Sequence, residues 1–157
     1  MDRVNIYTCT EQKGLCRCSR AAGYILELER EGRAPVTLTD FTVIGDATNN
    51  QADLRALTAA LERMTKPSEL CIYETSRYVA AGYTCGWVKE WKKSGWQTKQ
   101  GKPVSNAEDW KRLDALLSRH VVSWFLTDHH PYADWLEREV KKYAQAHEEA
   151  AILAGGA

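Results

Sequence analysis

The sequence has no apolar run approaching the roughly 20 residues that a membrane-spanning helix requires. No secretory signal peptide opens it, so we expect no contact with a membrane. Its formal net charge is zero, with 21 basic and 21 acidic residues. The whole molecule therefore exerts no non-specific attraction on a polyanion, and any polyanion site has to be a local patch. Internal repeats and low-complexity domains are also absent from the sequence.

The five cysteines lack a recognisable metal-binding pattern. Cys9, Cys16 and Cys18 follow one another as Cys-x6-Cys-x-Cys, which is not a standard zinc spacing, and no histidine lies near them. Zinc binding is therefore the less favoured interpretation of this turn. An odd number of cysteines without a secretory signal favours free thiols in a reducing compartment, so we expect a cytoplasmic protein.

What is present is the composition of one soluble globular domain. The chain has 157 residues, of which 44% are hydrophobic and 27% charged. That length is enough for a sizeable core and too short for two comfortable domains. We expect a single domain over 1–157, with its core in about 4–143 and an alanine-rich, frayed tail over 144–157.

Apolar spacing predicts three strands first, followed by helices that alternate with strands. The first strands are expected near 4–9, 23–29 and 35–44. Leucines at helical spacing predict a helix over 54–64, with Asn49 and Asn50 as candidate caps and Pro67 as its stop. The remaining expected elements are a strand at 70–73, a helix from Ser76 to Ala81, a helix capped by Asn106, a strand at 121–126, and a last helix with Pro131 in its first turn.

This order predicts a mixed α/β fold built on one five-stranded sheet. Three strands joined by short turns form an antiparallel meander, and the two later strands, reached through helices, are expected to pair in parallel. Helices flank the sheet. Between two of them runs a basic segment, Trp87 to Asn106, with three tryptophans and five lysines against one acid, Glu90. Such a segment suits a phosphate surface, although its tryptophans could equally pack on the core.

The element order, filled with these residues, resembles type 1 ribonuclease H. From Trp87 to Asp114 the sequence W-V-K-E-W-K-K-S-G-W-Q-T-K-Q-G-K-P-V-S-N-A-E-D-W-K-R-L-D is similar to the family's basic protrusion and following helix. The stretch T-N-N-Q-A-D-L, from Thr48 to Leu54, resembles the family's T-N-N-x-x-E-L, and Ser76 to Val79 resembles its D-S-x-Y-V. The resemblance implies a ribonuclease H-like fold from Val4 to about Tyr143.

The resemblance also implies a chemistry in which four carboxylates hold two magnesium ions that cut the RNA strand of an RNA–DNA hybrid. Two divalent cations side by side need several anionic oxygens to offset their repulsion. Cys9 stands at the position of the family's first acid, and Thr75 at that of the third. The second and fourth acids correspond to Asp53 and Glu137, which could alternatively be plain solvated helix residues. Two of the four carboxylates are therefore replaced.

Three neighbouring features bear on this loss. Glu11 lies two residues beyond Cys9 and is a candidate substitute ligand if the strand continues that far. Glu74 adjoins Thr75, but strand side chains alternate between faces, so the two should point in opposite directions. The family's histidine loop is shortened here to Asp128-His129-His130-Pro131, and either histidine is a candidate for its role.

The positions that resemble the family's substrate contacts are kept. Thr48 and Asn106 match its phosphate-binding pocket, Asn49 and Asn50 match its groove-contacting pair, and Arg77 replaces a polar contact residue. Amide and hydroxyl groups at sugars and phosphates recognise the shape of a duplex, but the same asparagines could simply cap turns. The predicted nucleic-acid-binding set is Thr48, Asn49, Asn50, Arg77, Trp87, Lys89, Trp91, Lys92, Lys93, Trp96, Lys99, Lys102 and Asn106.

The sequence thus predicts a ribonuclease H-like protein, expected to be monomeric, that binds RNA–DNA hybrid or double-stranded RNA with impaired or no catalysis. One alternative is an active ribonuclease H with an atypical Mg²⁺ or Mn²⁺ site formed by Asp53, Glu137 and Glu11, with Cys9 as a further candidate ligand. If the protein is inactive, no cofactor is expected. A second alternative is a protein-interaction module on the same fold.

Overall fold

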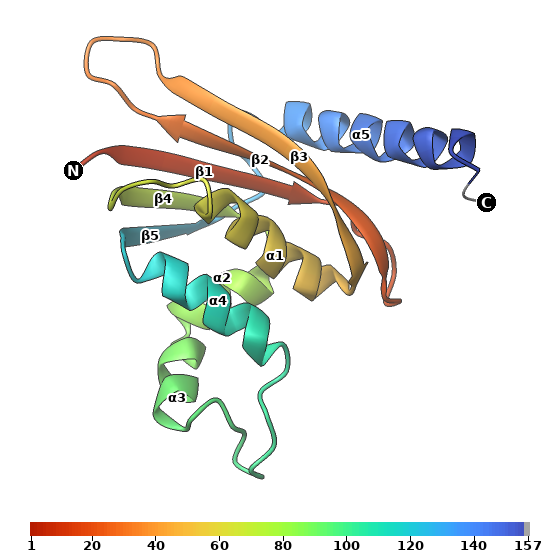
Figure 1. The fold of residues 1–157 in the computed structure, drawn as a ribbon. Helices are drawn as coiled ribbons and strands as arrows, with labels where there is room; N and C mark the ends of the chain where they lie inside the picture. The colour runs from red at the N-terminus through yellow and green to blue at the C-terminus, as the bar shows by residue number, and fades with distance from the viewer. Residues whose placement is uncertain (156–157) are drawn as a thin grey trace.

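The computed structural model describes residues 1–155. It contains one five-stranded sheet with the strand order β3-β2-β1-β4-β5 (Figure 1). The strands are β1 (Arg3–Thr10), β2 (Cys18–Leu28), β3 (Val36–Ala47), β4 (Glu69–Glu74) and β5 (Val121–Leu126). Strands β1, β2 and β3 pair antiparallel, whereas β4 pairs in parallel with β1 and β5 in parallel with β4. The predicted mixed sheet is therefore confirmed.

Five helices accompany the sheet, and they cover its two faces unequally. They are α1 (Asn49–Leu61), α2 (Arg77–Thr84), α3 (Trp87–Lys93), α4 (Ala107–Leu117) and α5 (Ala133–Leu153). Figure 1 shows α1, α2 and α4 on one face and α5 alone on the other. None of the helices in residues 1–155 has the length and apolar character needed to cross a membrane.

Each face of the sheet has its own apolar core. On the side of α1 and α4, Ile6 and Ile72 of the sheet share a cluster with Leu57 and with the fully buried Trp110 and Leu113. On the α5 side, Tyr7 and Ile25 lie in a second cluster with Leu136 and Val140. The period-2 alternation of the strands separates these sets, because successive side chains point to opposite faces.

The register of the two central strands determines where a site can form. Tyr7 of β1 lies opposite Tyr73 of β4, and the two strands run in parallel. Cys9, next to the last residue of β1, and Thr75, directly after β4, each lie two residues further along, so both lie at the carboxyl ends of these strands. Ligand sites of open α/β sheets typically lie beyond those ends.

The basic segment protrudes from the rest of the molecule. Helix α3 begins after Gly86, whose φ of 77° is accessible to glycine without strain. The chain then loops out and returns through a short bridge between Gln97 and Pro103. In Figure 1, α3 and this loop extend beyond the sheet and its covering helices.

Helix boundaries differ from the sequence prediction at α1. The N-cap is Thr48, not Asn49 or Asn50, because Thr48 and Gln51 form a reciprocal capping box. The Thr48 hydroxyl accepts from the Gln51 N–H at 3.2 Å, and the Gln51 side-chain oxygen accepts from the Thr48 N–H at 3.0 Å. Two orphan amides of the helix start are thereby satisfied. Asn49 and Asn50 lie within the first turn.

The last helix also differs from the prediction. It begins at Ala133 with Tyr132 as its N-cap, so Pro131 precedes the helix instead of forming its first turn. It then continues to Leu153, through the stretch after Tyr143 that was expected to fray. Alanine and glutamate, which dominate that stretch, are strong helix formers. The final Gly156 and Ala157 lie outside the described residues.

Candidate functional site

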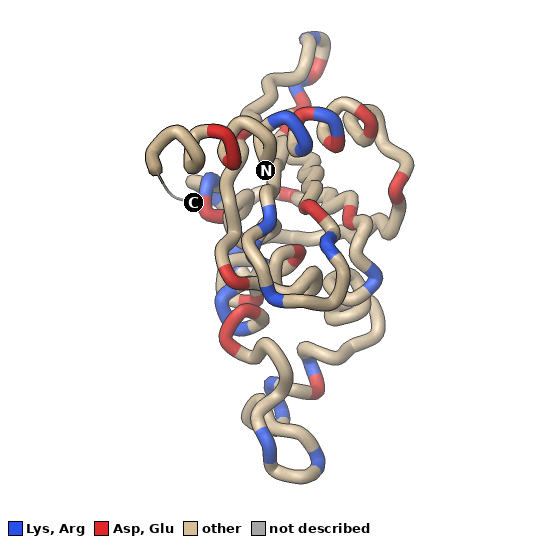
Figure 2. Tube along the Cα trace, turned by 90° about the vertical axis from the view of Figure 1, so that its right-hand side faces the viewer, with Lys and Arg blue, Asp and Glu red and all other residues tan. Residues whose placement is uncertain are grey.

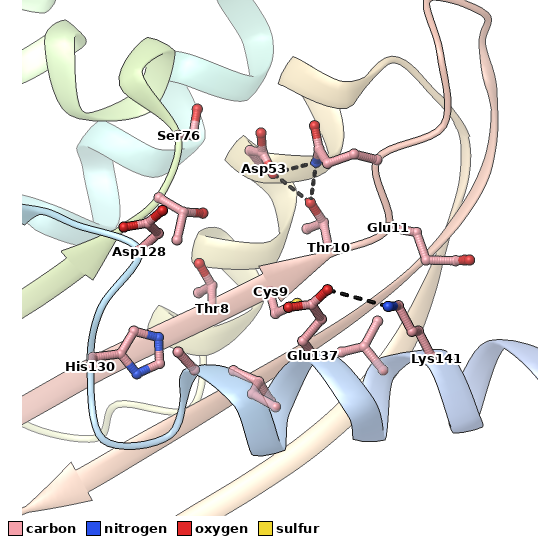
Figure 3. A pocket seen from close by; sticks show the side chains of 15 residues that line it. Thr8, Cys9, Thr10, Glu11, Asp53, Ser76, Asp128, His130, Glu137 and Lys141 are labelled. Carbon is pink, nitrogen blue, oxygen red and sulfur yellow. Dashed lines mark hydrogen bonds and ion pairs between the residues drawn. The ribbon is translucent and has the colours of Figure 1, made fainter.

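A pocket opens at the carboxyl ends of β1 and β4, between α1 and the start of α5 (Figure 3). The residues that line the pocket come from four segments of the chain that are far apart in sequence. The pocket is lined by Thr8, Cys9, Thr10, Glu11, Gln12, Asp53, Thr75, Ser76, Asp128, His130, Ala133, Leu136, Glu137, Val140 and Lys141. The structure thus brings together Cys9, Asp53, Thr75 and Glu137, the four positions that correspond to the family's acids.

Cys9 lies at the base of the pocket and is half-buried. Burial is the main cause that raises the pKa of its thiol to about 11, and the negative charges of Glu137 and Asp53 raise it further. Lys141 acts in the opposite direction. The sulfur is therefore a protonated thiol at neutral pH, which is a poor ligand for a hard cation such as Mg²⁺.

Asp53 projects from α1 and is satisfied by donors of the protein itself. Oγ1 of Thr10 donates to Oδ1 of Asp53 at 2.5 Å, and Nε2 of Gln12 lies 3.3 Å from the same oxygen. Gln12 also donates to the Thr10 hydroxyl at 2.7 Å. Burial raises the pKa of Asp53, and these hydrogen bonds oppose the rise. The chain consequently supplies neutral donors to one of the two carboxylate oxygens that a metal site would use.

Glu137 projects from the first turns of α5 and is paired with a cation. Nζ of Lys141 lies 3.3 Å from Oε1 of Glu137, one helical turn further along (Figure 3). Both side chains are largely exposed, so the pair itself adds little to stability. Its effect is local: a fixed positive charge lies inside the pocket, next to the carboxylate that corresponds to the fourth acid.

Glu74, next to Thr75 on β4, takes no part in the pocket. Thr75 lines the pocket and is exposed, whereas Glu74 is 1% exposed and lies outside the lining. Oε1 of Glu74 accepts from the Ser76 N–H at 3.0 Å, and Oε2 has no partner within the described part of the chain. Burial raises the pKa of Glu74 to about 8, with the charge of Asp53 adding to the rise. The carboxyl group is therefore mostly neutral near pH 7.

Glu11 reaches the rim of the pocket but directs its carboxylate elsewhere. Its Oε1 accepts from the Ala21 N–H at 2.8 Å, and Nζ of Lys13 lies 3.6 Å from it. Figure 3 shows Glu11 pointing away from Asp53. Strand β1 ends at Thr10, so the chain has already turned toward β2 at Glu11.

The two histidines of the shortened loop have different positions. His130 lines the pocket, its ring centroid lies 4.6 Å from that of Tyr7 in a tilted arrangement, and its Nδ1 accepts from the Tyr132 N–H at 3.2 Å. Burial lowers its pKa. His129 does not line the pocket; its side chain is 93% exposed and Nε2 lies 3.2 Å from Asp128. Asp128 itself lines the pocket, which sequence reasoning did not anticipate.

The side chains at these positions do not fit a pair of magnesium ions. Two of the four family positions carry a thiol and a hydroxyl, Asp53 is engaged by Thr10 and Gln12, and Glu137 is paired with Lys141. Within residues 1–155, no three His, Cys, Asp or Glu side chains gather closely enough to hold a metal ion. Magnesium requires hard oxygen ligands in near-octahedral geometry, and a pair of ions requires more negative charge than remains here.

The positions that resemble the phosphate-binding pocket are joined by a hydrogen-bonded chain. Gln51, which caps α1 together with Thr48, donates from Nε2 to Oδ1 of Asn106 at 3.0 Å. Nδ2 of Asn106 in turn donates to the hydroxyl of Tyr78 at 3.0 Å. Asn106 occupies the N-cap position of α4 with φ of 59°, but its side chain makes no capping bond. Its predicted role as a side-chain cap is therefore wrong, and its amide faces α1 instead.

Asn49 and Asn50, the predicted groove contacts, are in different situations. Oδ1 of Asn49 accepts from the Lys13 N–H at 3.1 Å and from the guanidinium of Arg20, and its Nδ2 donates to the Gly14 carbonyl at 3.2 Å. These bonds hold the β1–β2 loop. Asn50 is exposed, and so is Arg77 at the start of α2. Those two side chains are available to a partner, whereas Asn49 is mainly structural.

The tryptophans of the basic segment pack on one another and on the core. Ring centroids of Trp87 and Trp91 are 6.0 Å apart, those of Trp91 and Trp96 are 6.2 Å apart, and Trp91 lies 5.4 Å from the buried Trp110. Trp91 and Trp96 are half-buried, and Trp87 is 39% exposed. The tryptophans thus support the protrusion, and only Trp87 presents a large surface to solvent.

The lysines of the segment are exposed, but they differ in pairing. Lys92 pairs with Asp114 of α4 at 3.0 Å, and Lys93 pairs with Glu90 at 3.7 Å. Across the described residues, no ion pair involves the remaining three, Lys89, Lys99 and Lys102. Figure 2 shows basic residues at the tip of the protrusion. The positive charge of the protrusion that no acid in the described residues pairs therefore lies on Lys89, Lys99 and Lys102.

Several residues of the site were missed from the sequence. Thr10, Gln12 and Lys141 contact the two surviving carboxylates, and Asp128 adds a further acid to the lining. One signal was available: Lys141 follows Glu137 at helical spacing, which places the two on one face of a helix. The positions of Gln12 and Asp128 depend on loop conformations that periodicity does not reveal.

Comparison with curated proteins gives ribonuclease H relatives. The chain is 47% identical over 103 residues to the protein named "Ribonuclease H" of Cereibacter sphaeroides strain ATCC 17029, covering 64% of this chain and 66% of that protein. It is 49% identical over 77 residues to the protein of the same name from Bradyrhizobium diazoefficiens, covering 49% of each. The matched regions thus span less than two thirds of these relatives' own length.

Solved structures with the same fold are more distant in sequence. LC9-RNase H1, described as a type 1 RNase H with the type 2 active-site motif, superposes with a TM-score of 0.73 at 23% identity, covering 88% of this chain and 70% of that one. The N-terminal RNase H domain of a Mycobacterium tuberculosis protein gives a TM-score of 0.63 at 19% identity, with 94% and 99% covered. These likenesses establish the fold. The RNase H family model matches residues 2–135, and the chain therefore belongs to the RNase H family.

Proposed function

We propose that this protein binds RNA–DNA hybrid or double-stranded RNA and hydrolyses it slowly or not at all. The duplex would lie along the surface formed by the start of α1, the start of α4 and the protrusion. Thr48, Asn106, Asn50 and Arg77 would contact phosphates and sugars, with the exposed lysines of the protrusion alongside. Contacts of this type recognise the shape of the helix and its 2′-hydroxyls without reading base sequence.

The observation that carries this proposal is that the acids of the pocket have partners within the chain, whereas three lysines of the protrusion have none among the described residues. In the pocket, one oxygen of Asp53 accepts from Thr10 and Gln12, and one oxygen of Glu137 pairs with Lys141. On the protrusion, three exposed lysines lack ion pairs among the described residues. The chain thus retains cations for a polyanion while it satisfies internally the groups that would hold metal ions. A foamy viral protease-reverse transcriptase of the same fold was solved in complex with an RNA/DNA hybrid, at 15% identity and a TM-score of 0.61.

A second candidate function is hydrolysis of the RNA strand with an atypical Mg²⁺ or Mn²⁺ requirement. The presence of Asp128 in the pocket favours it, since Asp53, Glu137 and Asp128 together leave the lining acidic despite Lys141. An acidic pocket attracts cations. The ribonuclease names of the relatives also support this candidate.

One experiment separates the candidates. Labelled RNA–DNA hybrid, double-stranded RNA and double-stranded DNA are titrated with the protein in EDTA, and cleavage of the same duplexes is followed in Mg²⁺ and in Mn²⁺. Binding in EDTA to the two RNA-containing duplexes without cleavage in either metal is expected. Cleavage that Asp53→Asn abolishes would establish the second candidate, and failure to bind any duplex would favour a protein-interaction module.

A further inference from the structure

The turn between β1 and β2 carries two cysteine thiols in contact with each other. Sγ of Cys16 lies 3.9 Å from Sγ of Cys18, with Arg17 between them. Both are free cysteines; Cys16 is exposed and Cys18 is half-buried at the first position of β2. Neither residue lines the pocket at the strand ends or belongs to the proposed duplex-binding surface.

We propose that Cys16 and Cys18 form a reversible dithiol–disulfide pair that a peroxide oxidises. The thiolate of one cysteine attacks hydrogen peroxide, which forms a sulfenic acid and releases hydroxide. The second thiol attacks that sulfur, the disulfide bond forms, and the sulfenic oxygen leaves as water. Together the two cysteines lose two protons and two electrons, and one peroxide becomes two waters. A low-molecular-weight thiol restores the dithiol by exchange.

The geometry favours this pair over other sulfur chemistry. The sulfurs need to approach from 3.9 Å to the roughly 2.05 Å of a disulfide bond. The loop around them is exposed, and Gly14, at φ of 49°, has no atom within 4 Å of where a Cβ would stand. The loop therefore has room to adjust. A bridge across a single residue in an exposed loop is readily reduced again, as is typical of regulatory disulfides.

The other three cysteines are unsuited to the same reaction. Cys71 is 6% exposed. The pKa of Cys9 is raised to about 11, which suppresses its thiolate. Cys85 is exposed at the end of α2, but it has no sulfur neighbour within residues 1–155. Cys85 therefore serves as the control for a cysteine that is exposed to peroxide but has no second thiol to react with.

A change in this loop would reach the start of α1 through Arg20. The Arg20 side chain is fully buried and donates to the carbonyl of Cys16 at 2.7 Å and that of Lys13 at 3.1 Å. On its other side it donates to the carbonyl of Ala47 at 2.8 Å and to Oδ1 of Asn49. Drawing Cys16 toward Cys18 shifts a carbonyl that Arg20 binds. The same guanidinium anchors the first turn of α1, next to Thr48.

The test uses a tryptic map, because Arg17 separates the two cysteines. Digestion leaves them on separate peptides, Gly14–Arg17 and Cys18–Arg20. After treatment with hydrogen peroxide and blocking of free thiols, we expect these peptides to appear linked, two hydrogens lighter than their sum, and to separate again with dithiothreitol. Cys16→Ser and Cys18→Ser should each abolish the linked product, while Cys85→Ser should not affect it. Two separately blocked thiols, or sulfinic acid at Cys16 without a link, would overturn the proposal.

A separate measurement tests whether oxidation of Cys16 and Cys18 affects the start of α1 through Arg20. Hydrogen exchange of the Gln51 and Ala52 amides, which bond to the side chain and carbonyl of Thr48, should be faster in the oxidised protein. The Cys16→Ser variant treated with the same peroxide serves as the control and should show no change. Equal exchange in the oxidised and reduced protein would show that the loop changes without affecting α1.

Discussion

The ammonium of Lys141 lies 3.3 Å from the carboxylate of Glu137, inside a pocket whose other charged side chains are acidic. It is the one lysine or arginine that the described residues place in a lining with Glu11, Asp53, Asp128 and Glu137. A cation entering the pocket has to displace this ammonium or bind beside it. Lys141 therefore weakens any metal binding that the remaining acids would allow.

Lys141→Gln should tighten the binding of Mn²⁺ to this pocket. Removing one positive charge near the surface should favour the cation by about 1 kcal/mol, roughly fivefold in affinity. Electron paramagnetic resonance of free Mn²⁺ in a titration measures the change. Lys142→Gln is the matched control, since Lys142 lies on the same helix, is equally exposed at 72%, and pairs with Glu139. Equal affinity in the two variants would show that Lys141 does not control the pocket.

Removing Lys99 and Lys102 together, each changed to Gln, should weaken duplex binding at low salt. It should also flatten the slope of log affinity against log salt by about 2, since each phosphate contact contributes roughly 0.9. Lys92 and Lys93 are each paired with an acid, so the corresponding double variant should change the slope by less. Anisotropy titrations of labelled hybrid at several salt concentrations measure both slopes. A larger effect from Lys92 and Lys93 would place the duplex on the other side of the protrusion.

Glu74→Gln should remove a pH dependence of stability. The pKa of Glu74 rises from its ordinary value of 4.5 to about 8 on folding, so between these values the folded protein holds a proton that the unfolded chain releases. The stability present below pH 4.5 is then lost as the pH rises to about 8, by up to about 1.4 kcal/mol per pH unit. The variant should lack this decline and be the more stable protein near pH 7.

Urea unfolding at several pH values across that window measures the effect. Glu69→Gln is the matched control, because Glu69 lies on the same strand and is exposed. If Glu74→Gln and Glu69→Gln show the same dependence on pH as the unmodified protein, Glu74 is ionised in the folded state.

Gly82→Ala should destabilise the fold, because a Cβ at Gly82 would lie 2.3 Å from Cη2 of the buried Trp110. Overpacking of this kind typically costs about 1–3 kcal/mol. Gly45→Ala is the control: a Cβ there meets nothing within 4 Å, and its backbone needs no positive φ. Thermal unfolding of both variants should show a clear loss for the first and little change for the second.

The mixed sheet and the order of strands and helices along the chain could be predicted, because the apolar residues of each element have a clear period and the connections are short. The cap of α1 was misplaced, since Thr48 stands directly before two asparagines that are equally good candidates on propensity alone. Only the reciprocal bond with Gln51 distinguishes them. The extension of α5 beyond Tyr143 was missed because an alanine-rich end without a core face resembles a frayed tail.

Within the site, the sequence reveals the type of each residue and its position along a helix or strand. It does not reveal which side chains of different elements contact each other. Cys9 and Thr75 could be placed at the strand ends from the resemblance to the family's motifs, and the alternation of strand side chains separated Glu74 from Thr75. Tertiary distances and loop conformations determine the ion pair between Lys92 and Asp114 and the hydrogen bond from Gln12 to Asp53. These contacts decide which lysines are free for a duplex and which carboxylates are free for a metal.

Cys9→Asp together with Thr75→Asp should create hybrid cleavage well above that of the unmodified protein. Cys9 near the end of β1 and Thr75 directly after β4 both line the pocket, so the new carboxylates would join Asp53 and Glu137 around one space. Four carboxylates supply the negative charge that a pair of Mg²⁺ ions requires. Either change alone should do little, because three acids beside Lys141 still leave too little charge.

Cleavage of labelled hybrid in Mg²⁺ measures the gain, and three further variants show where it arises. Asp53→Asn added to the double variant should abolish it. Lys141→Gln added to the double variant should increase it, because the competing ammonium is then absent. Glu74→Asp in place of Thr75→Asp should give no activity, because Glu74 lies outside the pocket lining. Strong cleavage by the unmodified protein, lost on Asp53→Asn, would instead show that the pocket is already a working metal site.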